Sequence, residues 1–206
     1  MQRSTALLAI GFAFLVGIDA AHAAPVTYTA TLAGANENPP NASPGIGSAT
    51  VIIDTAAHTL RVVSNFSGLT SNTTASHIHC CAVPPANAGV ATTTPSFVGF
   101  PLGVTSGSMD QTYDTTLAGS WNPAFITSHG GTPATAEAAL AAGLAAGQAY
   151  LNIHTANFPG GELRGNLVLQ AVLSPLATPT LSDWVMVLLA LLLAASAWLV
   201  LRKRTL

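Results

Sequence analysis

The stretch QAYLNIH, residues 148–154, alternates apolar and polar side chains. Leu151 and Ile153 fall on one side of an extended chain, and Asn152 and His154 fall on the other. A period of two is typical of a β-strand that buries one face in a core. The stretch therefore predicts a strand whose apolar face meets the core and whose polar face carries an amide and an imidazole.

Similar stretches recur through residues 25–170, separated by clusters of glycine, proline, asparagine and aspartate. This spacing favours a mostly β domain, a Greek-key-like β-sandwich or barrel. The predicted strands are Val26–Ala33, Ser48–Asp54, Leu60–Phe66, Ala75–Cys81, Ser108–Leu117, Gln148–His154 and Glu162–Leu169. Thr132 as N-cap and Pro133 at the first helical position predict one surface helix over Ala134–Ala146, and Asn122–Ser128 predicts a short helical turn.

The N-terminus has the pattern of a cleavable signal peptide. Arg3 precedes an apolar stretch over residues 6–18, and Ala21-His22-Ala23 supplies small residues at a cleavage site. Residues 1–23 are therefore predicted to be removed on export. The alternative is an uncleaved membrane anchor, for which this apolar stretch is short.

The C-terminus has the pattern of a membrane span. An uninterrupted apolar run over residues 184–201 is long enough for a transmembrane helix, and the basic tail at residues 202–206 follows at once. Trp184 at one end and the basic cluster at the other place the tail in the cytoplasm. The domain is then expected in the periplasm, joined by residues 171–183 to an inner-membrane anchor.

The predicted domain carries little charge. Residues 25–175 contain two arginines, no lysine and six carboxylates, which gives 2 − 6 = −4. Such a surface lacks the cations that contact nucleic-acid phosphates, so no nucleic-acid partner is expected. The sequence also shows no Gly-x-Ser-x-Gly elbow, no paired-carboxylate site and no lysine for a Schiff base, so an enzyme is not expected.

The histidines supply a candidate metal site. His77 and His79 lie two apart on one predicted strand, and Asn152 and His154 lie two apart on another. If the two strands are neighbours, three imidazoles and an amide converge, and imidazole suits zinc and copper. The alternative is a metal-free cluster in which each ring is hydrogen-bonded. His58 and His129 are not predicted as ligands.

The two cysteines, Cys80 and Cys81, are adjacent in the sequence. An oxidising compartment favours a disulfide, yet Cα atoms about 3.8 Å apart are closer than usual for one. By strand alternation Cys81 shares the face of His77 and His79, so a reduced Cys81 is an alternative fourth metal ligand. Free or intermolecular thiols are the third alternative.

Glu162 and Arg164 are opposite charges two residues apart on a predicted strand. A structural ion pair is the simplest interpretation, and a contact with a binding partner is the alternative.

These segments resemble the CHRD domain, a module named after chordin and found in many exported bacterial proteins. The matching motifs are YTATLAG (28–34), ENPP (37–40), GSATV (47–51), FSGL (66–69), ASHIH (75–79), GV (89–90), AYLNIHT (149–155) and FPGGELRG (158–165). The resemblance spans residues 26–168. It implies a β-sandwich-like extracellular module and supplies no catalytic residue.

The segment before the apolar run resembles the exosortase-type (IPTL-like) sorting signals of bacterial envelope proteins. Its residues are Pro179, Thr180, Leu181, Ser182, Asp183 and Trp184, similar to the pattern IPTLSEWG. The resemblance implies recognition by a membrane sorting protease, with display at the cell surface or release. The alternative is a permanent single-pass anchor.

Two functions follow from these patterns. The first is an envelope-displayed binding or structural module whose partner is a surface protein or matrix ligand. The alternative is a copper- or zinc-binding redox protein that uses the histidine cluster.

The predicted topology has a direct test with alkaline phosphatase, which is active only outside the cytoplasm. A fusion after Leu173 is expected to be active, and a fusion at the C-terminus is expected to be inactive, because residues 202–206 are basic. The reverse pattern of activities would mean that the orientation is wrong.

Overall fold

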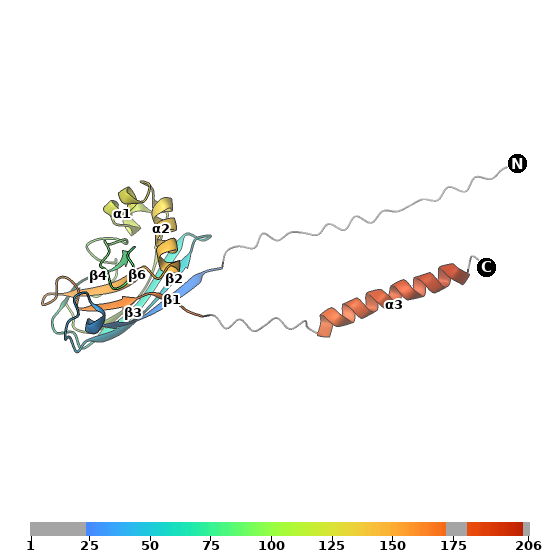
Figure 1. The fold of residues 1–206 in the computed structure, drawn as a ribbon, viewed down its shortest axis with the longest axis horizontal. Helices are drawn as coiled ribbons and strands as arrows, with labels where there is room; N and C mark the ends of the chain where they lie inside the picture. The colour runs from blue at the N-terminus through green and yellow to red at the C-terminus, as the bar shows by residue number, and fades with distance from the viewer. Residues whose placement is uncertain (1–23, 172–180, 204–206) are drawn as a thin grey trace. The chain divides into compact units, whose positions relative to one another are not determined.

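The computed structural model describes residues 24–171 and 181–203 (Figure 1). The chain divides into two units, with the boundary between Gln170 and Ala171. The predicted signal peptide, residues 1–23, lies outside the described residues. So do Pro179 and Thr180 of the predicted sorting motif.

The first unit is one curled antiparallel sheet. Its strands are β1 (Val26–Ala33), β2 (Ile46–Asp54), β3 (Thr59–Ser67), β4 (Thr73–Cys80), β5 (Gly107–Asp114), β6 (Ala149–Thr155), β7 (Leu163–Asn166) and β8 (Val168–Leu169). The order across the sheet is β4-β6-β7-β1-β2-β3-β5, and β8 pairs with β1. The sheet curls into a half-barrel (Figure 1). The mostly β fold class is thereby confirmed.

The core is formed by alternate residues of the strands, which point to the same face of the sheet and are buried there. In β1 to β3, Leu32, Val51 and Val62 are completely buried. In β4 and β6, Ile78 and Leu151 pair across the strands and are also completely buried. The predicted core face of these two strands is therefore correct, and the histidines lie on the other face.

The last predicted strand, Glu162–Leu169, is divided in two. β7 ends at Asn166, and Leu167, which follows it, is fully buried and donates its N–H to the carbonyl of Ala149 in β6. The chain then turns so that Val168 pairs with Thr29 of β1 as part of β8. β7 pairs with both β6 and β1, whereas β8 pairs with β1, and alternation alone does not reveal this division.

Short helices fill the connections. They are the 3-10 helices η1 (Gly34–Asn36) and η2 (Ala118–Ser120), with α1 (Pro123–Ser128) and α2 (Pro133–Ala145). Thr132 and Thr135 form a capping box at the start of α2, as the N-cap prediction requires. Leu140 and Leu144 of α2 are buried, so the predicted surface helix covers part of the core.

The second unit contains α3 (Leu181–Lys203). Within it, Val185–Arg202 has a mean hydropathy of 2.3 and is long and apolar enough to cross a membrane. This agrees with the predicted apolar span of residues 184–201. The backbone of residues 181–184, the last part of the predicted sorting motif, is helical.

A disulfide joins Cys80, the last residue of β4, to Cys81. The bond packs against α2 at Gly143, where a Cβ atom would overlap both sulfur atoms. The Cys81 sulfur also lies 3.7 Å from the carbonyl oxygen of Ala139 in the same helix. Gly143 therefore allows α2 to approach the end of β4 closely.

We expect Gly143→Ala to destabilise the protein. Alanine favours a helix by about 1 kcal/mol over glycine, but the new methyl group would have to displace two bonded sulfur atoms, and overpacking costs about 1–3 kcal/mol. Urea denaturation measures the free energy of unfolding. Gly119→Ala is the control, because nothing lies within 4 Å of a Cβ at Gly119. Equal stability of Gly143→Ala and the parent protein would contradict this packing.

Candidate metal centre

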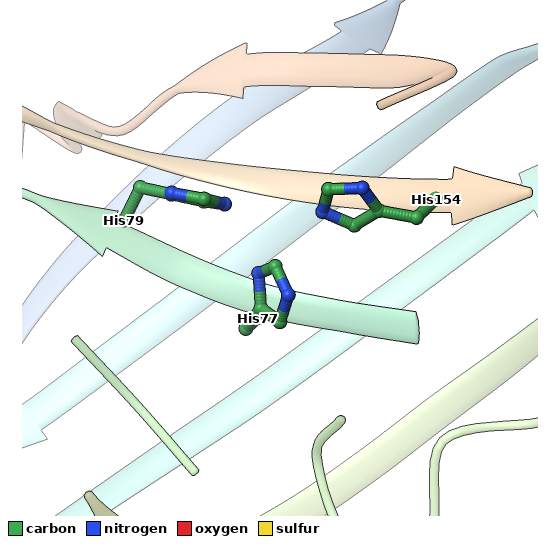
Figure 2. Close-up of side chains that lie close together, drawn as sticks. All are labelled: His77, His79 and His154. Atoms are coloured by element: carbon green, nitrogen blue, oxygen red, sulfur yellow. The ribbon is translucent and has the colours of Figure 1, made fainter. Parts of the chain in front are cut away.

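The antiparallel pairing of β4 with β6 brings three imidazoles together. In this register His77 lies opposite Asn152, and His154 lies opposite Ala75. His77, His79 and His154 each place a nitrogen within 4.8 Å of the others. Figure 2 shows their three rings turned toward a common space. The convergence expected of neighbouring strands is therefore present in the structure.

Hydrogen bonds to backbone carbonyls determine which ring nitrogen carries the free lone pair in His79 and in His154. His79 Nδ1 lies 2.8 Å from the carbonyl oxygen of Ala88, and His154 Nδ1 lies 2.9 Å from that of Pro159. A carbonyl only accepts, so both Nδ1 atoms must donate, and each neutral ring keeps its lone pair on Nε2. Backbone carbonyls orient metal-binding histidines in the same way.

The remaining nitrogens of the cluster are free to bind. His79 Nε2, His154 Nε2 and His77 Nδ1 are buried and have no hydrogen-bond partner in the described part of the chain. A hydrogen-bonded, metal-free cluster would satisfy these atoms, since buried polar atoms are normally paired. Three unpaired nitrogens facing one another fit the ligand set of a zinc or copper ion.

Burial keeps these imidazoles neutral. It lowers the pKa of His77 to about 3, with the neighbouring histidines adding to the effect. It lowers the pKa of His79 to about 4 and also lowers the pKa of His154. A metal ion binds the neutral form of imidazole, so no proton competes for the site at neutral pH.

An aromatic and a cationic side chain lie beside the cluster. The rings of His79 and Tyr150 stack with centroids 4.7 Å apart and planes 5° apart. The Arg164 guanidinium carbon lies 3.5 Å from the centroid of the Tyr150 ring. Arg164 also donates to Asn87 Oδ1 at 2.8 Å and to the carbonyl of Ala86 at 3.0 Å. These contacts hold Tyr150 and His79 in place.

A carboxyl group and an amide complete the polar surroundings. Asn152 lies between His77 and Arg164 in the register of the sheet, and its Nδ2 donates to Glu37 Oε2 at 3.4 Å. Burial raises the pKa of Glu37 to about 7, although Asn152 and Arg164 favour the charged form. Glu37 is therefore partly protonated at neutral pH.

Cys81 does not join the histidines. Its sulfur is bonded to Cys80, and the group of converging metal-binding atoms consists of the three histidines without it. β4 ends at Cys80, so the alternation that would aim Cys81 with the histidines no longer applies. The sulfurs instead face Gly143 of α2. The alternative of a Cys81 thiolate ligand is therefore corrected by the structure.

The predicted ion pair between Glu162 and Arg164 is wrong. The ion pairs among the described residues are His58–Glu137 and Arg61–Asp110, so Glu162 and Arg164 do not form one. Its carboxylate accepts hydrogen bonds from Ser43, the Thr70 N–H and Thr155. Burial raises the pKa of Glu162, but these hydrogen bonds outweigh it and lower the value overall.

The two remaining histidines of the domain lie elsewhere, as predicted. His58 Nδ1 lies 2.9 Å from Glu137 Oε2 and links the β2–β3 turn to α2. His129 ends α1, with Nδ1 2.9 Å from the carbonyl of Phe125.

The CHRD domain family matches residues 28–167, which include the whole histidine cluster and the strands that carry it. This chain is a CHRD domain protein. Comparison with curated proteins and with solved structures finds no match. The match supports the resemblance seen in the motifs and points to an extracellular or envelope module. The cluster thus lies within the CHRD domain, on segments that its motifs include.

Sequence patterns missed Glu37, Tyr150 and Arg164 as neighbours of the CHRD domain's histidines. Tyr150 shares the parity of Asn152 and His154, which is a signal that the sequence does contain. Arg164 could be placed only by knowing that β7 lies beside β6. Glu37 reaches the site from the loop after η1, for which no periodic pattern exists.

The lowered pKa values predict how the stability of the metal-free CHRD domain depends on pH. Unfolded histidine has a pKa near 6.5, so below that value the unfolded chain takes up protons that the folded cluster refuses. The contribution of these histidines to the stability of the fold is therefore present above about pH 6.5. It is lost as the pH falls toward about 4, the pKa of His79, and about 3, the pKa of His77. Glu37 acts in the opposite sense between about pH 4.5 and 7.

A histidine variant separates these contributions. Urea unfolding in the presence of a chelator measures the free energy of unfolding at about pH 7.5 and at about pH 4.5. Between these two pH values we expect this free energy to fall by less in His77→Gln than in the parent protein. A difference on the order of 1–3 kcal/mol is expected. His129→Gln is the control and should follow the parent. Equal losses in the parent and His77→Gln would rule out a neutral buried His77.

Proposed function

We propose that this protein is an exported CHRD module, anchored to the inner membrane by α3, whose histidine cluster binds one copper or zinc ion. The observation that carries the proposal is the set of three unpaired nitrogens of His77, His79 and His154. Orienting carbonyls behind two of them support binding to metal rather than a network among the rings.

Membrane attachment rests on the composition of the C-terminal helix. Val185–Arg202 carries no charge before Arg202 at its end, and every residue in this span is exposed on its own helix. An exposed apolar helix is stable where lipid surrounds it. With the basic residues in the cytoplasm, the CHRD domain faces the periplasm. The IPTL-like motif at residues 179–184 would let an exosortase-type protease transfer the domain to the cell surface.

The proposed role is binding rather than catalysis. Three imidazoles hold both oxidation states of copper and also hold zinc, so geometry alone permits a redox role with copper and a structural or storage role with zinc. The small number of charged residues in the domain fits a module that meets other envelope components without strong electrostatic attraction.

Metal analysis of the full chain in detergent tests the proposal. After exposure to copper or zinc and removal of unbound metal, about one equivalent should remain, because three ligands define one site. His77→Gln should weaken binding by about a hundredfold or more, since removal of a ligand costs at least as much as removal of an outer partner.

His129→Gln is the matched control, because His129 hydrogen-bonds within α1 and lies outside the cluster. Retention of metal in this variant with loss in His77→Gln is the expected pair of results. No retained metal in the parent chain, or equal retention in the two variants, would overturn the proposal.

A further inference from the structure

The Cys80–Cys81 disulfide closes no loop of the chain. A disulfide stabilises a fold mainly by closing a loop in the unfolded chain, and this effect grows with the length of the loop. Cys80 and Cys81 are neighbours, so no residue lies between them. The fold therefore gains little from loop closure by this bond.

Hydrogen bonds already hold the backbone on both sides of the disulfide. The N–H of Cys80 donates to the carbonyl of Gly89 at 3.1 Å. The N–H of Ala82 donates to the carbonyl of Gln148 at 3.1 Å. Because these bonds do not involve the sulfur atoms, the path of the chain can persist when the disulfide opens.

The two cysteines differ in their exposure to solvent. Cys81 is exposed, whereas Cys80 is only 4% exposed. A disulfide opens when a thiolate attacks one of its sulfur atoms, and exposed disulfides are typically the labile ones. The exposure therefore favours attack at Cys81, with Cys80 as the leaving sulfur.

Space for a released sulfur atom exists beside Cys80. Two thiol sulfurs cannot lie as close together as two bonded sulfurs, so they must separate on reduction. They cannot move toward α2, because a Cβ atom at Gly143 would already overlap both of them. A cavity of about 220 Å³, however, is lined by Cys80 together with Ser128, His129 and neighbouring residues. The Cys80 thiol can turn into this cavity while α2 stays against β4.

We propose that Cys80 and Cys81 form a reversible thiol–disulfide exchange site whose partner is a dithiol. A thiolate of the dithiol attacks Cys81 Sγ, and a mixed disulfide forms as the bond to Cys80 breaks. Cys80 leaves as a thiolate, takes up a proton and turns into the cavity. The second thiol of the partner loses its proton and attacks the partner's own sulfur in the mixed disulfide, which releases Cys81 as a thiolate that is then protonated.

The exchange is balanced in electrons and protons. One dithiol is oxidised to a disulfide and gives up two electrons and two protons, and the cysteine pair takes up the same number as it becomes two thiols. The reverse steps, with a disulfide as oxidant, restore the bond between Cys80 and Cys81. No metal takes part, so the proposal is independent of the histidine cluster.

Redox equilibration of the full chain in detergent tests the exchange. The chain is kept metal-free with a chelator and equilibrated without denaturant at fixed ratios of reduced to oxidised dithiothreitol. Thiols are then trapped with N-ethylmaleimide and counted by mass spectrometry. We expect both thiols to appear together, and the same curve whether the chain starts reduced or oxidised. A bond that is reduced only in urea, or one that does not form again, would overturn the proposal.

Serine variants test which sulfur is attacked. Cys80→Ser leaves the exposed Cys81 as a single thiol, and Cys81→Ser leaves the buried Cys80. With dithiodipyridine, an aromatic disulfide, Cys80→Ser should react at least about tenfold faster than Cys81→Ser, because reaction requires an accessible thiolate. Equal rates, or a faster reaction in Cys81→Ser, would contradict attack at Cys81.

A variant that fills the cavity tests where Cys80 goes. Ala124 of α1 is exposed and lines the cavity, so Ala124→Leu should crowd the released thiol. The ratio of reduced to oxidised chain at a given ratio of dithiothreitol should fall by about tenfold, since overpacking costs about 1–3 kcal/mol. Thr127→Leu is the matched control, because Thr127 is exposed on the same helix and does not line the cavity.

Equal reduction of Ala124→Leu and the parent would contradict movement of Cys80 into the cavity. If Ala124→Leu fails to fold, the equilibration of the parent chain and the comparison of the serine variants decide.

Discussion

The antiparallel pairing of β4 with β6 is the constraint on which the functional region depends. Its register places His77 opposite Asn152 and Ile78 opposite Leu151, so that one face is apolar and the other carries imidazoles. A shift of one residue would exchange the two faces of β6 and bury its polar residues in the core. The fully buried Ile78, Leu151 and Ile153 therefore hold the histidines in position through the register.

The polar face is unusual because it too is covered. Loops that contain Ala88 and Pro159 lie over it and orient the rings of His79 and His154 with their carbonyls. Covering the rings lowers their pKa values and leaves their inner nitrogens without protein partners. An arrangement that is unfavourable for stability alone becomes favourable when an ion uses those nitrogens, which is typical of a preformed binding site.

The opposite side of β4 is joined to the helical layer. Cys80 and Cys81 form a disulfide that lies against Gly143 of α2, while Leu140 and Leu144 of the same helix enter the core. The end of β4 is thus restrained immediately after His79. The family match over residues 28–167 includes this whole assembly, so the site belongs to the CHRD domain and not to the C-terminal unit.

The sequence by itself determined the local features of this protein. Alternation in residues 75–81 and 148–154 was sufficient to place His77 with His79, to place Asn152 with His154, and to oppose them to Ile78 and Leu151. Thr132 and Pro133 were sufficient to predict the capped helix α2, and the uninterrupted apolar run of residues 184–201 was sufficient to predict the span in α3. These features depend on residues within a few positions of one another, where backbone geometry sets which side chains share a face.

Only the tertiary structure decided which strands are neighbours. The order β4-β6-β7-β1 joins segments that are far apart in the sequence, and it alone placed Arg164 beside Tyr150 and the histidines. It also separated Glu162 from Arg164 and turned Cys81 toward α2. The physical reason is that ladder hydrogen bonds are alike for every pair of strands. Partners are selected by the fit of all the side chains in the core, which no local pattern contains.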